Sequence, residues 1–314
     1  MKVGILGAGS MGGLFAGRLF RSGADVVLLD RNPELIETVR KNGLEVKDRA
    51  ETYRLTVPIY DTREYDGQPD VLLLFVKAPS VEQAMLDAAK NIGERTMVVC
   101  LVNGLGHERH ILPHVDASQI LMGATALGAI SDGLGRVRWT YEGETYIGPL
   151  GRKITEPMEE IRRLLERAGI STILTERVED YIWTKLFINI SYNSLTAITG
   201  LTNGELVGSE TGRKLMNMLV DETAAVAKQL GIHPHYPDPM QAVIDIGRFI
   251  GPNRSTMLQD VLAGRRTEID ALNGAVARLG REAGVDVKAN EIVTHLVKLI
   301  EEKTAKEVTR TNGV

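Results

Sequence analysis

Short apolar runs alternate with amphipathic stretches through the first half of the chain, which predicts a regular α/β arrangement. Residues 71–76 and 97–102 are apolar at every position, as expected of parallel strands buried on both faces. The full set of predicted strands is 3–6, 25–30, 71–76, 97–102, 137–140, 145–148 and 171–174. The predicted helices of this half are 11–20, 81–91 and 155–168.

Beyond residue 178 the pattern is helical only. Apolar residues recur at helical spacing through 179–197, 209–230, 254–263, 266–284 and 288–304. The change of periodicity near Arg177 predicts two domains, residues 1–177 and residues 178–314. The expected fold class is α/β, with an N-terminal Rossmann-type, doubly wound parallel sheet and a C-terminal all-helical domain.

The turn after the first predicted strand contains three spaced glycines. Its residues are Gly7, Ala8, Gly9, Ser10, Met11 and Gly12. The first glycine of such a motif permits a tight turn, the second lets phosphates approach bare backbone, and the third lets the helix pack close to the strand. The acid expected about 20 residues further on is Asp30, at the end of the second strand. The pattern therefore predicts that a dinucleotide binds with its pyrophosphate at the N-terminus of the helix.

Two further buried strands end in polar residues. Lys77 follows 71–76, and Asn103 follows 97–102. Ligands of open α/β sheets bind at the edge formed by the carboxyl ends of the strands, so both residues are candidates for cofactor contacts.

One predicted helix combines an apolar circumference with a single polar stripe. Within 179–197, Lys185, Asn189 and Asn193 follow one another at intervals of four. A lysine and two amides on one face suit an oxo-acid ligand, because lysine can donate a proton to a carbonyl oxygen and amides can hold hydroxyl or carboxylate groups. A narrow solvent-facing strip with a snorkelling lysine is the structural alternative.

A second polar stretch lies between residues 252 and 270. Asn253 and Ser255 are good helix caps, and Thr267 and Glu268 are expected to begin the next helix. Glu268 is either an ordinary first-turn acid or the carboxylate that partners Lys185, and spacing alone leaves both interpretations open.

Composition narrows the class of protein. The 314 residues include 43% hydrophobic and 25% charged residues with a net charge of −4, and no long basic stretch predicts nucleic-acid binding. Cys100 is the only cysteine, which excludes an intrachain disulfide and suits a reducing compartment. With no transmembrane run and no signal-peptide layout, a cytoplasmic protein is expected.

Taken together, the motifs resemble the ketopantoate (2-dehydropantoate) 2-reductase family from residue 2 to about residue 300. The resemblance rests on the glycine motif, Val-Lys77-Ala, Asn103-Gly-Leu-Gly, Trp-Thr-Lys185-Leu-x-x-Asn189-x-x-x-Asn193, Thr-Asn203-Gly-Glu-Leu, Asn253-Arg-Ser-Thr-Met-Leu-Gln-Asp and Thr-Glu268-Ile-Asp. It implies reduction of 2-dehydropantoate to (R)-pantoate by NADPH, in the pantothenate branch of coenzyme A synthesis.

The resemblance also implies roles for individual residues. Lys185 matches the general acid, and Glu268 matches the carboxylate near the lysine and the nicotinamide. Arg31 matches the arginine that meets the 2′-phosphate, and Lys77, Asn103 and Ala129 match contacts to the nicotinamide half of the cofactor. The matches to substrate contacts are Asn189, Asn193, Asn203, Asn253, Arg254, Ser255 and Thr256. No metal is expected, and the partner is a small 2-keto acid, with a homodimer left open.

Some residues depart from the family pattern. Asp30 at the end of its strand favours the free ribose hydroxyl of NAD, whereas Arg31 favours the 2′-phosphate of NADP. We expect a slight preference for NADP(H), with NAD(H) kept open by Asp30. Thr256 replaces a frequent serine, which narrows the pocket, and Ser194 replaces a frequent proline.

Two alternatives to the reductase remain. The stretch from Val99 to Glu108 is also similar to D-2-hydroxyacid dehydrogenases of the D-mandelate type, which favours another branched or aromatic 2-keto acid as substrate. The alternative of a different class is a non-catalytic protein that senses nicotinamide dinucleotides.

Overall fold

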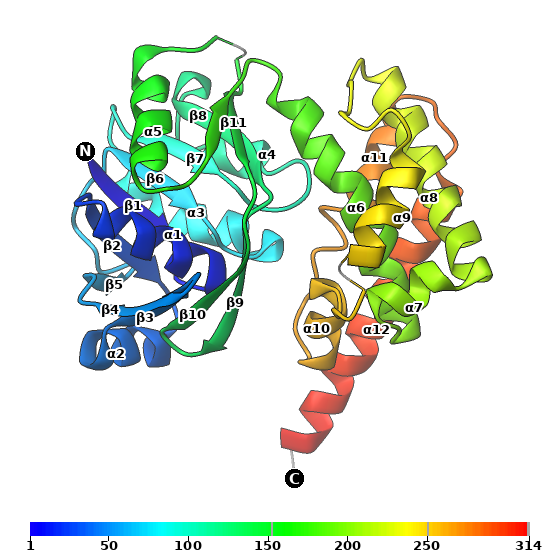
Figure 1. Ribbon diagram of the computed structural model, residues 1–314, viewed down its shortest axis with the longest axis horizontal. Helices are drawn as coiled ribbons and strands as arrows, with labels where there is room; N and C mark the ends of the chain where they lie inside the picture. The colour runs from blue at the N-terminus through cyan, green and yellow to red at the C-terminus, as the bar shows by residue number, and fades with distance from the viewer. Residues whose placement is uncertain (152, 250, 313–314) are drawn as a thin grey trace. The chain divides into compact units, whose positions relative to one another are not determined.

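The computed structural model describes residues 1–151, 153–249 and 251–312 (Figure 1). Contacts divide the chain into two compact units. The first comprises Met1–Val102 and His107–Val178, and the second comprises Asn103–Gly106 and the residues from Glu179 onward. The four residues 103–106 therefore belong with the helical unit, whereas a single boundary after residue 177 would place them in the first.

The first unit is built from alternating strands and helices. Its elements are β1 (Lys2–Leu6), α1 (Ser10–Arg21), β2 (Asp25–Asp30), α2 (Pro33–Asn42), β3 (Leu44–Asp48), β4 (Glu51–Leu55), β5 (Ile59–Asp61), β6 (Val71–Leu74), η1 (Ala78–Ser80), α3 (Val81–Ala88), η2 (Ala89–Asn91), β7 (Met97–Cys100), α4 (Glu108–Ile111), η3 (Ala117–Gln119), β8 (Ile120–Thr125), β9 (Gly128–Gly133), β10 (Arg136–Tyr141), β11 (Thr145–Pro149), α5 (Glu156–Arg167) and β12 (Thr172–Leu174).

The main sheet has eight strands in the order β12-β11-β8-β7-β6-β1-β2-β5. Neighbouring strands are parallel except for β8 and β11. β1 lies between β6 and β2, where Ile5 is in register with Leu28 of β2 and Leu73 of β6. The expected parallel sheet is confirmed, with one antiparallel pair toward its β12 edge.

Both faces of this sheet are covered. Val71 and Leu73 of β6 belong to a core shared with residues of α1, α2 and α5, while the alternate residues Leu72 and Leu74 on the opposite face are also buried. Burial on both faces explains why β6 and β7 are apolar throughout. The doubly wound arrangement follows from this covering.

A second sheet of four strands, in the order β4-β3-β10-β9, packs along α1. A Cβ atom on Gly13 would lie 2.8 Å from Val137 Cγ1, and one on Gly17 would lie 2.7 Å from Val46 Cγ2. Glycine on this face of α1 thus allows helix and sheet to approach closely, which holds α1 from the side opposite the main sheet.

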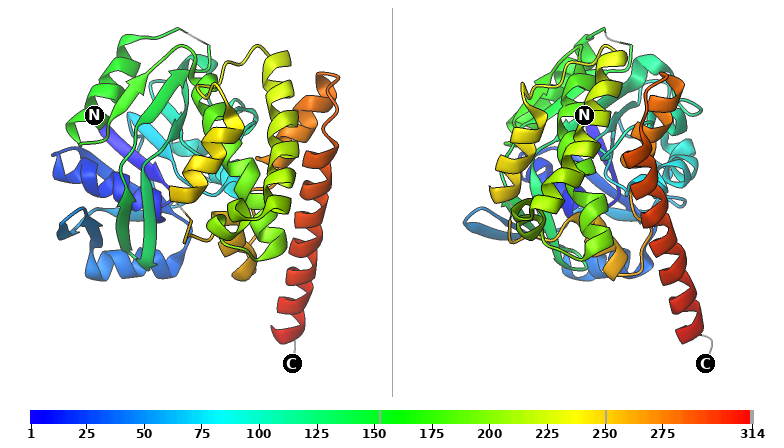
Figure 2. Two further views of the ribbon diagram at one scale, coloured as in Figure 1. Left: turned by 45° about the vertical axis from the view of Figure 1, so that its right-hand side comes forward. Right: turned by 90° about the vertical axis from the view of Figure 1, so that its right-hand side faces the viewer.

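The second unit is helical in its described part. Its elements are α6 (Val178–Thr199, whose first residue belongs to the first unit), α7 (Asn203–Gly208), α8 (Glu210–Gln229), α9 (Pro239–Phe249), α10 (Thr256–Leu262), α11 (Asn273–Glu282) and α12 (Lys288–Asn312). The core residues Phe187 and Ile190 of α6 pack with side chains of α8, α11 and α12. Both views of Figure 2 show the C-terminal turns of α12, in red, extending beyond the other helices of this unit.

One predicted helix begins later than expected. Residues 266–284 were expected to be helical from Thr267, but α11 begins at Asn273. The Thr267 N–H donates to the Glu301 carboxylate at 2.6 Å, and the N–H groups of Ala271 and Leu272 donate to the Glu268 carbonyl oxygen. Glu268 therefore lies in a turn that precedes the helix.

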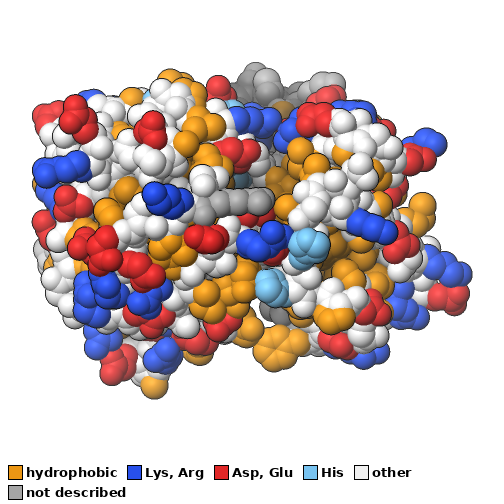
Figure 3. Space-filling view, turned by 90° about the horizontal axis from the view of Figure 1, so that it is seen from above, with side chains coloured by type: hydrophobic (Ala, Val, Ile, Leu, Met, Phe, Trp, Pro, Cys, Tyr) orange, Lys and Arg blue, Asp and Glu red, His pale blue; other side chains and the backbone are white. Residues whose placement is uncertain are grey.

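The surface carries charges of both signs. Figure 3 shows basic and acidic side chains interspersed on the face that it draws. Within the described ranges, no helix is long and apolar enough to span a membrane, and no cluster of side chains suited to a metal ion occurs.

Candidate active site

The glycine turn between β1 and α1 has the geometry of a phosphate-binding loop. Gly7 has φ +98°, and a Cβ on Gly12 would lie 1.9 Å from the Gly7 carbonyl oxygen, so both positions require glycine. A Cβ on Gly9 would meet no described atom within 4 Å, which leaves this side of the loop open. Among the described residues, no side chain caps the N-terminus of α1. The first N–H groups of α1 therefore suit a pyrophosphate.

Asp30 connects this loop to the turn after β2. Its Oδ2 accepts the Ala8 N–H at 2.7 Å, and its Oδ1 accepts the N–H groups of Arg31 at 2.7 Å and Asn32 at 2.9 Å. Both carboxylate oxygens therefore hold backbone in place. The Ala8 N–H, which the sequence assigned to the cofactor, donates to this carboxylate.

Arg31 lies beside an acid of another element. Its Nε is 3.1 Å from Oδ2 of Asp87, on α3. The Arg31 side chain is half-exposed, whereas that of Asp87 is largely buried. The guanidinium is thus both accessible and paired.

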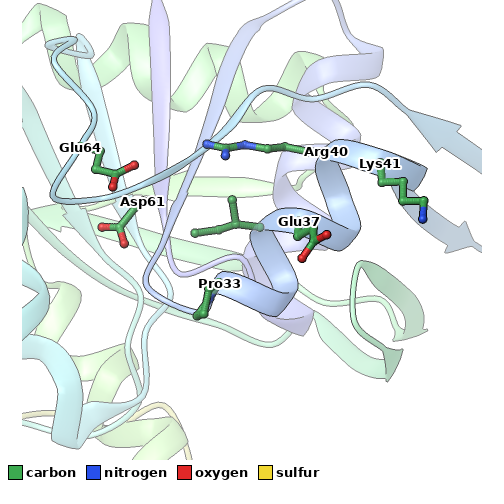
Figure 4. Close-up of a pocket in the computed structure, with 7 residues that line it drawn as sticks. Pro33, Glu37, Arg40, Lys41, Asp61 and Glu64 are labelled. Carbon is green, nitrogen blue, oxygen red and sulfur yellow. The ribbon is translucent and has the colours of Figure 1, made fainter.

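A cavity of about 440 Å³ lies next to the end of β2 (Figure 4). It is bordered by α2 and by residues at and after the end of β5. Its lining residues are Pro33, Ile36, Glu37, Arg40, Lys41, Asp61 and Glu64. Three acids face two bases here, so the cavity has no excess of positive charge for an anion.

The other cofactor candidates of the first unit come from different elements. Lys77 is exposed and follows β6, which lies beside β1 in the main sheet. Ala129 is half-buried in β9 of the second sheet, and β9 packs along α1. The adjacent parallel strands β1, β2 and β6 thus bring Gly7, Asp30 and Lys77 to the edge formed by the carboxyl ends of the strands.

In the second unit, α6 carries the polar stripe. Lys185 and Asn189 are half-buried and Asn193 is buried, at 6% exposure. Removal of water lowers the pKa of Lys185 to about 8, and the negative charge of Glu268 acts in the opposite direction. An amino group with this pKa exchanges protons readily near neutrality, as a general acid must.

Glu268 is brought to Lys185 by the turn that precedes α11. The residue is 5% exposed, and its charge acts on the Lys185 ammonium group. Buried acids are rare without a partner, so this electrostatic coupling favours the interpretation of Glu268 as the lysine's carboxylate over an exposed first-turn acid.

The segment that begins with Asn103 packs against the same turn. The Leu105 N–H donates to the Ala271 carbonyl oxygen at 2.9 Å. Gly104 has φ +100°, and a Cβ there would lie 2.5 Å from that oxygen. The segment 103–106 is therefore seated on the turn that holds Glu268.

Asn203 and Asn253 are joined through their backbones. The Asn203 N–H donates to the Asn253 carbonyl oxygen at 3.0 Å. Asn203 is 3% exposed, and its Oδ1 accepts no hydrogen bond from the residues that the structure describes. A buried acceptor of this kind suits a ligand hydroxyl group.

In the segment from Asn253 to Thr256, one side chain supports the fold and the other three are exposed. The Ser255 hydroxyl is buried, receives a hydrogen bond from Thr196 at 2.6 Å and accepts the Leu258 N–H at 3.1 Å as the N-cap of α10. Its side chain thus supports the helix. Asn253, Arg254 and Thr256 are exposed.

Two residues near these groups, Thr196 and Asp87, were not predicted from the sequence. Thr196 continues the polar stripe three residues after Asn193, a helical spacing that could have been noticed. Asp87 is linked to Arg31 only by the fold, and the sequence holds no signal for that pair.

A phosphate-binding turn on a Rossmann-type sheet, with a helical unit that carries a half-buried lysine coupled to a buried carboxylate, defines an oxidoreductase that uses a nicotinamide dinucleotide. The comparisons give the family: Ketopantoate reductase PanE/ApbA matches residues 3–152, and its C-terminal counterpart matches residues 177–301. The chain belongs to the ketopantoate reductase family.

Individual relatives agree. The 2-dehydropantoate 2-reductase of Streptococcus pyogenes serotype M1 is 33% identical over 299 residues, covering 95% of this chain and 97% of the relative. The solved ketopantoate reductase from Ralstonia eutropha JMP134 is 28% identical with a TM-score of 0.88, covering 97% of this chain and 100% of that one. D-mandelate dehydrogenase with NADH and anilino(oxo)acetate is 30% identical with a TM-score of 0.92 and the same coverage.

Proposed function

We propose that this protein reduces 2-dehydropantoate to (R)-pantoate with a nicotinamide dinucleotide. The observation that carries the proposal is the position of Lys185 on the polar stripe of the otherwise apolar α6, where the charge of Glu268, from the turn before α11, acts on it. The full-length similarity to 2-dehydropantoate 2-reductases supports the substrate.

Lys185 acts as the general acid. When bound, the nicotinamide supplies a hydride to the 2-keto carbon. The Lys185 ammonium group donates a proton to the carbonyl oxygen, on which negative charge develops. Glu268 holds the lysine and accepts a hydrogen bond from the substrate hydroxyl.

Asparagines orient the rest of the substrate. Asn189 and Asn193 lie one and two helical turns from Lys185, within reach of the same small ligand. The unsatisfied Oδ1 of Asn203 is suited to a second hydroxyl contact. Asn103 and Lys77 are assigned to the nicotinamide half, and Asn253, Arg254 and Thr256 to the substrate carboxylate.

The cofactor is NADP(H) in preference to NAD(H). Both oxygens of Asp30 accept backbone N–H groups, which supports a role in ordering the glycine loop over a role in selecting NAD. The half-exposed guanidinium of Arg31 is suited to the 2′-phosphate. A cytoplasmic location is part of the proposal, because the single Cys100 is buried and free.

A D-2-hydroxyacid dehydrogenase of the D-mandelate type is the second candidate function. The observation in its favour is the TM-score of 0.92 to D-mandelate dehydrogenase. The two candidates differ in substrate, because ketopantoate has a hydroxyl group that phenylglyoxylate lacks.

The test is oxidation of NADPH and NADH by the purified protein with ketopantoate, phenylglyoxylate or 2-ketoisocaproate. We expect kcat/KM to favour ketopantoate by about one to two decades, because a buried acceptor left unpaired costs roughly 1–3 kcal/mol. Glu268→Gln should reduce that preference. A preference for phenylglyoxylate would establish the second candidate, and cofactor binding without turnover of any substrate would establish a sensor.

A further inference from the structure

In the Arg31–Asp87 pair the cation is accessible to solvent, whereas the anion is largely buried. The side chain of Arg31 is 51% exposed, and that of Asp87 is 9% exposed. Removing the positive charge from such a pair leaves a buried charge without compensation, which is strongly unfavourable. Loss of the ion pair is therefore more costly for Asp87 than for Arg31.

Asp87 has few other interactions. Its Oδ1 accepts a hydrogen bond from Gln83 Nε2 at 2.9 Å. Its Oδ2 accepts no hydrogen bond from the described residues and lies 3.1 Å from Arg31 Nε. Arg31 is thus the charged neighbour in contact with this carboxylate.

A second arginine whose charge acts on Asp87, Arg63, is already paired with another acid. Arg63 forms two side-chain hydrogen bonds with Asp61, from Nε at 2.9 Å and from a terminal nitrogen at 2.6 Å. These bonds lower the pKa of Asp61 to about 2, so Asp61 stays ionised at neutral pH. The interaction between Arg63 and Asp87 is electrostatic only. The same holds for Arg31 and Asp61.

We propose that Asp87 is a specificity-determining residue that limits the preference for NADPH over NADH by holding the Arg31 guanidinium. This inference rests on the proposed function. A 2′-phosphate can engage Arg31 fully only by drawing it away from Asp87, which would leave a buried carboxylate poorly compensated. NADH has no 2′-phosphate and leaves the pair intact, so Asp87 weakens NADPH binding selectively.

The experiment measures the dissociation constants of NADPH and NADH without substrate, by fluorescence titration of wild type and Asp87→Asn. Asparagine has nearly the same shape, and its side-chain oxygen can still accept from Gln83. We expect the variant to bind NADPH about three- to tenfold more tightly, the size of one partly buried charge interaction. NADH binding should change by less than about twofold on the same grounds.

Two further variants make the result specific. Asp66→Asn removes an exposed carboxylate paired with Lys90 in the same unit and should leave the NADPH to NADH ratio unchanged. Arg31→Ala combined with Asp87→Asn should abolish the gain, because the released guanidinium is its source. The double variant should therefore have the same ratio of NADPH to NADH affinity as Arg31→Ala alone, and a gain that persists without Arg31 would contradict the inference.

Three outcomes would overturn the inference: an unchanged ratio in Asp87→Asn, equal tightening of both cofactors, or the same gain in Asp66→Asn. Because no substrate is present, a wrong 2-keto acid in the proposed function leaves these results unaffected. Failure of the wild type to bind either dinucleotide would refute both proposals together.

Discussion

Lys185 has a lowered pKa, and its proposed role is that of the general acid. Burial lowers the pKa to about 8, and the ammonium form is the one that can donate a proton. We therefore expect kcat/KM for ketone reduction to be constant at low pH and to fall as the pH rises through about 8. Glu268→Gln should move this fall to lower pH, because it removes the negative charge that raises the lysine pKa.

Lys185→Ala tests the same assignment directly. It should lower turnover by about two to four decades and remove the fall near pH 8, with cofactor binding nearly unchanged. The pH profiles are measured by initial rates, and circular dichroism at each pH checks that the variants stay folded. A variant that retains more than about a tenth of wild-type turnover would exclude Lys185 as the acid.

At the scale of residues, the sequence predicts positions that depend on short-range spacing along the chain. Lys185, Asn189 and Asn193 follow from helical periodicity alone, and Gly7 and Gly12 follow from a motif. The Asp87–Arg31 pair and the hydrogen bond from Thr196 to Ser255 join residues 56 and 59 positions apart. Such contacts exist only once the elements are packed, so no local pattern contains them.

At the scale of elements, α9 packs on α6 through a glycine. A Cβ on Gly247 would lie 1.6 Å from Tyr192 Oη, which donates a hydrogen bond to the Val243 carbonyl oxygen at 2.7 Å. Gly247→Ala should lower the free energy of unfolding in urea by about 1–3 kcal/mol, because one of the two helices must move.

The matched control for this substitution is Gly208→Ala. Gly208 ends α7, and a Cβ there would meet no described atom within 4 Å. Its alanine variant should be as stable as the wild type or slightly more so. Equal stability of both variants would contradict the close contact between α9 and Tyr192.

Elements were predictable where apolar runs or helical periodicity were strong. β2 has the predicted bounds, 25–30, and the main sheet follows from its apolar strands. The second sheet was not foreseen, because β3 pairs with β10 from a distant part of the chain. The late start of α11 has a similar cause, since the Thr267 N–H bonds to Glu301, 34 residues away.

At the scale of the whole molecule, α12 has two apolar faces. Val293 and Val297 are buried in the helical core, while Ile292, Leu296 and Leu299 are 58%, 41% and 59% exposed. These three exposed residues follow the spacing i, i+4, i+7, which forms one stripe along the helix. If the homodimer left open by the sequence forms through this stripe, a second copy would cover these three residues.

Leu296→Glu should convert that dimer to monomers, because it places a charge at the centre of the apolar contact. Sedimentation equilibrium measures the mass of each form. Leu86→Glu is the matched control, since Leu86 is 54% exposed on α3 of the other unit. A wild type that is monomeric at all protein concentrations would exclude such a dimer.

The tetrapeptide Asn103–Gly106 belongs with the helical unit although the chain on both sides of it belongs to the sheet unit. Anyone who exchanges halves between relatives to alter substrate choice therefore cannot use a single crossover after residue 178. Such a hybrid would seat one parent's tetrapeptide on the other parent's Glu268 turn. Because Gly104 approaches Ala271 so closely, the tetrapeptide and the helical half should be inherited as one module.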